Sequence, residues 1–101
     1  MSKLVELAEK EIMRKNILEV LEECEDEGAS EELIAKCLAR IGHSCSMDEV
    51  KRECSYLKGK ELVEINHIEN KTLGISRNVI KITSKGMDVL DGTSTVKGMG
   101  G

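Results

Sequence analysis

The sequence predicts a mainly α-helical domain with one small antiparallel β-hairpin. Apolar residues recur every three or four positions through most of residues 3–58, as they do on one face of an amphipathic helix. Between residues 61 and 83 the spacing shortens to about two and β-branched residues dominate, which is typical of strands. Glycine follows each helical pattern, so we expect short, separate helices.

The helical region divides into three segments, which we expect at 3–26, 30–41 and 47–58. Ser30 is a favourable N-cap for the second segment. Ser46, with Glu49 three residues later, forms a capping box at the start of the third.

The hairpin at 61–83 is followed by a short helix at 84–91, for which Thr83 is a suitable N-cap. The last segment, 92–101, holds four glycines and almost no apolar residues. We therefore expect a flexible Gly-rich tail there.

Three helices followed by a hairpin is the element order of a winged helix-turn-helix, so we assign residues 1–91 to one such domain. The segments 30–41 and 47–58 form its helix-turn-helix, and 47–58 is the recognition helix. The core must be aliphatic, because the chain has no Phe or Trp and Tyr56 is its one aromatic residue.

The charge distribution bears on the class of partner. The 101-residue chain has a net charge of −4, and residues 1–40 hold six Lys and Arg against eleven Asp and Glu. Residues 47–85 hold eight against six, enough for weak electrostatic steering towards DNA. No apolar run approaches the roughly 18–20 residues of a membrane span, and no secretory signal is visible, so we expect a cytoplasmic protein.

The end of the domain resembles a known motif. Residues 82–92, Ile-Thr-Ser-Lys-Gly-Met-Asp-Val-Leu-Asp-Gly, are similar to the strand-then-helix ending LTxxGxxVxxG of many bacterial winged-helix regulators. Extended through Val96-Lys97-Gly98, the segment is similar to small winged-helix proteins of Mu-like phages and prophages. This resemblance implies a phage-borne or prophage-borne protein with no assigned catalytic activity.

We predict DNA contacts on the face of the third helix opposite its apolar stripe. The candidates are Lys51, Arg52, Ser55, Tyr56 and Lys58. Arginine can read a guanine edge, serine can bond a base or a phosphate, and lysines can hold backbone phosphates. The alternative is a solvated helix face on which Asp48 and Arg52 pair at i,i+4.

The wing, whose tip we expect at 69–76, adds Lys71 and Arg77 as candidate DNA contacts. The alternative for these side chains is that basic residues on an edge strand simply discourage sheet-to-sheet aggregation.

The first helix extends about two turns beyond what a trihelical core needs. Leu4, Val5, Leu7 and Ala8 would then protrude as an apolar stripe. Exposed apolar stripes usually meet a partner, so we predict a homodimer that sets two recognition helices on one face of DNA. The alternative is a helix that folds back onto the hairpin.

The cysteines and histidines predict no metal site. Cys24, Cys37 and Cys54 fall on apolar helical stripes, where cysteine behaves as a small hydrophobe. Cys45 lies in the turn beside His43, which leaves a zinc site or a redox-sensing thiol of lowered pKa as alternatives.

No nucleotide fingerprint and no nucleophile elbow occurs, so we predict neither an enzyme nor a cofactor. Two functions remain besides a metal- or redox-responsive switch at Cys45. The first is a small dimeric DNA-binding transcription regulator or accessory factor of a phage or prophage. The second is a protein–protein interaction module that presents the acidic first helix and its apolar stripe on the same scaffold.

Overall fold

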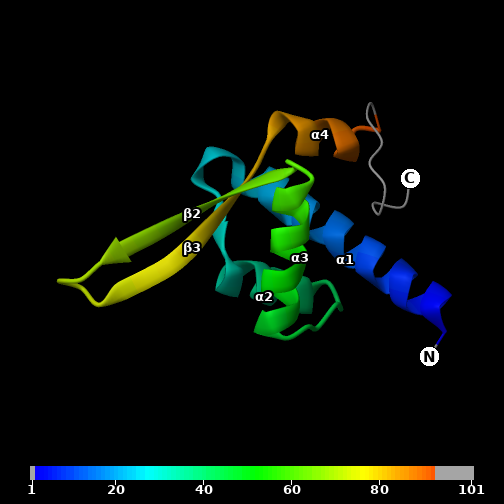
Figure 1. The fold of residues 1–101 in the computed structure, drawn as a ribbon, viewed down its shortest axis with the longest axis horizontal. Coiled ribbons are helices and arrows are strands. Elements are labelled where there is room, and N and C mark those ends of the chain that lie inside the picture. Colours follow the sequence, from blue (N-terminus) through cyan, green and yellow to red (C-terminus); the bar gives the residue numbers. More distant parts are fainter. Residues whose placement is uncertain (1, 93–101) are drawn as a thin grey trace.

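The computed structural model describes residues 2–92, and most of the predicted tail, 93–101, lies outside them. The elements in chain order are α1 (Lys3–Cys24), a single 3₁₀ turn η1 (Glu25–Glu27), β1 (Ala29–Ser30), α2 (Glu31–Arg40), α3 (Met47–Gly59), β2 (Val63–Asn70), β3 (Ile75–Ile82) and α4 (Ser84–Leu90). Figure 1 shows the helices gathered in one body, from which β2 and β3 project as a long hairpin.

The predicted fold class is confirmed. Helices α1, α2 and α3 pack against one another, and α4 packs against α1. The hairpin follows α3 directly and forms the wing (Figure 1). No helix within residues 2–92 has the length and apolar character that a membrane span needs.

The sheet contains a third strand that the sequence did not predict. Strand β1 pairs antiparallel with β3, with Ala29 opposite Ile80, so the strand order is β1-β3-β2. A two-residue strand is too short to show an alternating pattern. Gly28 makes this pairing possible, because its φ is +71° and a Cβ there would lie 2.5 Å from the Ile80 carbonyl oxygen.

The first helix ends two residues earlier than predicted. Cys24 is its last residue, and Glu25 adopts a left-handed φ of +51°. The acidic run that follows opposes the negative end of the helix dipole and forms the η1 turn instead.

The core is aliphatic, as predicted, and only the C-terminal half of α1 contributes to it. Its fully buried side chains are Ile17, Leu18 and Leu21. By contrast, Leu4 and Ile12 are 77% and 55% exposed. The apolar stripe of the first turns therefore faces away from the core.

The predicted caps are present. Ser30 Oγ accepts the Leu33 N–H at 3.1 Å, and Thr83 Oγ1 accepts the Gly86 N–H at the same distance. A Cβ at Gly86 would collide with the Leu62 carbonyl oxygen. The Thr-x-x-Gly part of the motif thus both caps α4 and lets it pack closely.

Candidate nucleic-acid interface

Helix α3 is anchored on one side and free on the other. Val50, Cys54 and Leu57 are fully buried in the core. On the other side, four of the predicted contacts are exposed together, namely Lys51, Arg52, Ser55 and Lys58. Three of these four side chains carry positive charge, so this face can approach phosphates.

Tyr56 does not share this face, although the sequence placed it there. Its ring is half-buried and lies under the Arg14 guanidinium, 3.6 Å from the ring centroid, with the Lys60 ammonium at 5.6 Å. Because Arg14 belongs to α1, the ring faces the α1–α3 contact. Tyr56 therefore helps to hold the recognition helix rather than extending its exposed face.

A buried ion pair joins α1 and α3, and the sequence pattern did not predict it. Arg14 Nε donates to Glu53 Oε1 at 2.6 Å, and both side chains are nearly buried. Arg52 Nε lies 3.6 Å from the other carboxylate oxygen of Glu53. Within residues 2–92, Arg52 thus pairs with Glu53 and not with Asp48.

One pattern could have revealed this pair. Arg14 precedes Leu18 by four residues and Leu21 by seven, which places it on the buried face of α1. A charge in a core register requires an opposite charge on the facing helix.

The start of α3 is held by the predicted capping box. The Ser46 N–H and O–H both donate to Glu49 Oε1, at 3.1 and 3.2 Å, and the Glu49 N–H donates to Ser46 Oγ at 3.2 Å. These hydrogen bonds lower the pKa of Glu49. The first turn therefore carries negative charge, and the basic side chains follow one turn later.

The wing offers two separated basic side chains. Lys71 lies in the turn, and Arg77 lies on β3 opposite Ile68 of β2; both are exposed. The turn is fixed because Asn70 Oδ1 accepts the Leu73 N–H at 3.1 Å. Lys71 is thus presented at the tip and Arg77 along the outer side of the hairpin.

A chain of polar side chains ties the wing to α2. His67 Nδ1 lies 3.0 Å from Asn78 Oδ1, and the Asn78 amide donates to a Glu31 carboxylate oxygen at 3.4 Å. His67 Nε2 also lies 3.2 Å from Ser76 Oγ. The Asn78 side-chain NH₂ donates to Glu31, which leaves its Oδ1 to accept a hydrogen bond from His67 Nδ1–H. Hydrogen bonds therefore connect the hairpin to Glu31, the first residue of α2.

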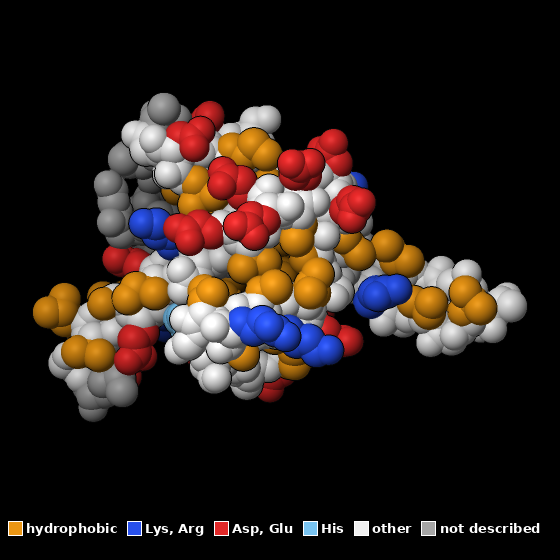
Figure 2. Space-filling model, turned by 180° about the vertical axis from the view of Figure 1, so that it is seen from behind, with side chains coloured by type: hydrophobic (Ala, Val, Ile, Leu, Met, Phe, Trp, Pro, Cys, Tyr) orange, Lys and Arg blue, Asp and Glu red, His pale blue; other side chains and the backbone are white. Residues whose placement is uncertain are grey.

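Acidic side chains gather on the other side of the molecule. Figure 2 views the chain from behind α3 and shows carboxylates clustered over α1 and the η1 turn. The acidic residues of α1 and η1 are Glu6, Glu9, Glu11, Glu19, Glu22, Glu23, Glu25, Asp26 and Glu27. Part of the negative charge nevertheless lies beside α3, because Glu6 and Glu9 of α1 line one open pocket together with Arg52.

The cysteines do not form the alternative site at Cys45. Burial, and then the neighbouring Glu49, raise the pKa of Cys45, whereas the redox-sensing alternative expected a lowered pKa. His43 Nδ1 accepts from the Asn16 amide at 3.4 Å. Among residues 2–92, no three His, Cys, Asp or Glu side chains lie close enough to hold a metal ion. Burial raises the pKa of Cys54 to about 12, as expected of a core thiol.

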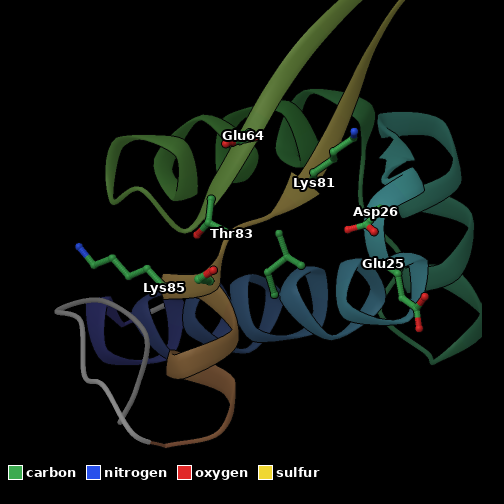
Figure 3. A pocket seen from close by; sticks show the side chains of 8 residues that line it. Glu25, Asp26, Glu64, Lys81, Thr83 and Lys85 are labelled. Carbon is green, nitrogen blue, oxygen red and sulfur yellow. The ribbon is translucent and has the colours of Figure 1, made fainter.

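An open groove of about 630 Å³ lies between the η1 turn and the start of α4. Figure 3 shows Glu25 and Asp26 on one side of it and Thr83 and Lys85 on the other. Thr83 is committed to structure, since its hydroxyl donates to the Glu61 carbonyl at 2.8 Å while capping α4. The groove mixes charges of both signs and offers no converging set of donors, so we assign it no ligand.

The sequence is similar to one phage protein. It is 32% identical to a protein of Escherichia phage Mu, named uncharacterized protein gp26. The aligned region of 83 residues covers 82% of this chain and 79% of that protein. The chain belongs to the gp26 family. No protein-family model matches it.

Two solved structures resemble this gp26-family chain in fold. A PadR-like transcription factor from Bacteroides fragilis has a TM-score of 0.78 and 21% identity, over 91% of this chain and 85% of that one. A PadR family transcription regulator from Clostridium difficile has a TM-score of 0.69 and 17% identity, over 80% and 81%. At these identities the likeness shows the winged-helix fold.

Proposed function

We propose that this protein is a DNA-binding winged-helix transcription regulator or accessory factor of a phage or prophage, acting in the host cytoplasm by binding rather than catalysis. The observation that carries the proposal is the exposed basic face of α3, set beside a projecting wing that carries Lys71 and Arg77. The winged-helix fold that the chain shares with two transcription factors supports it.

The roles of the side chains follow from their places on the fold. Arg52, near the middle of α3, reads a base edge in the major groove, and Ser55 one turn later contacts a base or phosphate. Lys51 and Lys58 hold phosphates on either side. Lys71 at the wing tip follows the adjacent backbone or minor groove.

The proposal includes a homodimer through the N-terminal turns of α1. Leu4 is 77% and Leu7 54% exposed, and Val5 and Ala8 are exposed beside them. Figure 2 shows hydrophobic side chains along this end of the helix. A twofold contact there would remove them from water and leave both α3 faces open to DNA.

The test is binding of unselected duplex DNA at low and moderate salt. Wild type should bind at low salt and weaken as salt rises, and K51E/R52E should lose binding. The matched control is K15E/K36E, which makes the same change in charge at two exposed lysines outside α3 and outside the exposed apolar turns of α1. Equal loss in both double variants would reduce the effect to net charge.

The rival function is a protein–protein interaction module, which the acidic side of the molecule and the exposed apolar turns of α1 favour. No detectable DNA binding at low salt would select it, because the phosphate contribution to affinity does not depend on base sequence. A pull-down from host cells would then identify the partner.

A further inference from the structure

Building on the proposed DNA binding, we propose that Glu53 is a positioning residue that sets the sequence specificity of Arg52. Glu53 does not touch DNA in this arrangement. It is buried between α1 and α3, and it holds the one arginine on the exposed face of the recognition helix.

The Glu53 carboxylate is itself fixed in place. Its side chain is 3% exposed, and its Oε1 accepts from Arg14 Nε at 2.6 Å. The Arg14 guanidinium stacks on the Tyr56 ring, 3.6 Å from the centroid. Three side chains from two packed helices therefore determine where this carboxylate lies.

Arg52 uses the other oxygen of that carboxylate. Neighbouring residues on a helix point about 100° apart, so the 3.6 Å approach of Arg52 Nε to Glu53 Oε2 requires the Arg52 side chain to bend towards α1. The side chain nevertheless stays 63% exposed. Of its nitrogens, Nε is the one that pairs with this carboxylate oxygen.

This orientation suits recognition of guanine. An arginine reads guanine through two parallel hydrogen bonds to O6 and N7, and the terminal nitrogens can donate both. A side chain that is already oriented loses less rotamer freedom when it binds. Arg14 balances the Glu53 charge, so Glu53 alone does not cancel the charge of Arg52, although Glu6, Glu9 and Glu49 line the same pocket as Arg52.

The first measurement needs no DNA. In NMR spectra of the wild-type protein, the Arg52 Nε–H should be more ordered than that of Arg77, which is exposed on the wing, and less ordered than that of the buried Arg14. Arg52 Nε–H motion equal to that of Arg77 would overturn the inference and leave the proposed function standing.

The second measurement is sequence discrimination. Duplexes enriched by wild type from a randomised pool are compared with scrambled duplexes. E53Q should lower the affinity ratio about tenfold, while D48N, which removes the same charge from the same helix, should leave it unchanged. In an R52A background, E53Q should have no further effect on the ratio.

The outcomes separate the two proposals. Two results would overturn the role of Glu53 and leave the proposed DNA binding standing. One is unchanged sequence discrimination in a folded E53Q variant. The other is that E53Q lowers discrimination as much in the R52A background as in wild type. Binding without any enriched sequence would do the same, because Arg52 would then read no base. Wild type that binds no duplex at all would overturn both. If E53Q does not fold, the comparison of Arg52 with Arg77 in the wild-type spectra decides, because it needs no variant.

Discussion

Residues 3–12 and 13–24 form the two halves of one continuous helix, α1, yet only the second half builds the core. The second half buries Met13, Ile17, Leu18 and Leu21, whereas Leu4 in the first half is largely exposed. The two halves share a backbone conformation and similar apolar side chains. What differs is the direction in which those side chains point relative to α2 and α3.

The difference comes from a break in spacing. Leu4, Ala8 and Ile12 follow one another every four residues, but the next apolar residue in that series, Ile17, comes after five. Met13 lies about 100° around the helix from Ile12 and joins the buried face. Apolar spacing thus predicts that the segment is a helix. It does not show which of the two apolar stripes of α1 faces the core.

The largest expected effect concerns the charge buried in the second half. R14A leaves Glu53 buried without its short ion pair, and we expect the free energy of unfolding to fall by about 3–5 kcal/mol. The matched control is K15A, an exposed neighbour on the same helix, which should change stability by less than about 0.5 kcal/mol. Urea unfolding followed by circular dichroism measures both.

An R14A variant as stable as K15A would contradict this account. It would mean that Glu53 gains water or another partner when Arg14 is removed, and the link between α1 and α3 would then depend on apolar packing alone.

The next effect compares leucines of the two halves. L18A should cost about 2–5 kcal/mol, because a fully buried side chain leaves a cavity. L4A should cost less than about 0.5 kcal/mol at low protein concentration, where dimer formation does not add to stability. Similar losses in the two variants would show that the first turns pack on the domain.

Local patterns predicted much of this fold, and long-range contacts account for what they missed. The caps at Ser30, Ser46 and Thr83 lie within four residues of the groups they satisfy, so sequence spacing reveals them. Strand β1 depends on β3, fifty residues later, and on the close approach at Gly28. No local pattern contains that information.

The same division applies to the candidate interface. Helical spacing grouped Lys51, Arg52 and Ser55 on the exposed side of α3, where the structure places them. It also grouped Tyr56 with them, because the position of Arg14 over that ring depends on how α1 crosses α3. Whether a side chain on the flank of a helix is buried or exposed depends on how the neighbouring helix packs. The spacing along its own helix does not determine it.

A smaller effect compares two serine caps. Ser2 caps the exposed end of α1, where its Oγ accepts the Val5 N–H at 3.3 Å. Ser46 caps α3, a helix that packs on the core. S46A should lower the free energy of unfolding by about 1 kcal/mol. S2A should reduce helicity at the chain end with almost no change in global stability, because the first turns can fray alone.

The Ser46 cap should also depend on pH. The pKa of Glu49 is lowered in the folded protein, so its contribution is present above the unfolded carboxyl pKa of about 4.3 and is lost as pH falls through the lower folded value. The stability difference between wild type and S46A should therefore shrink in acid. A difference that is constant from pH 7 to pH 3 would show that the carboxylate contributes nothing to the cap.

Substitutions at the exposed N-terminal end of α1 should have the smallest effect on stability and the largest effect on dimer formation. L4E/L7E and a chain lacking residues 1–9 should both unfold like wild type at low concentration, because these side chains contribute nothing to the core. Both should sediment as monomers where wild type sediments as a dimer. K3E adds an acidic group beside Leu4 without removing apolar surface, so it should remain dimeric. Wild type that sediments as a monomer at high concentration, or a dimer that survives both changes, would place the contact elsewhere and leave the first half of α1 for another protein.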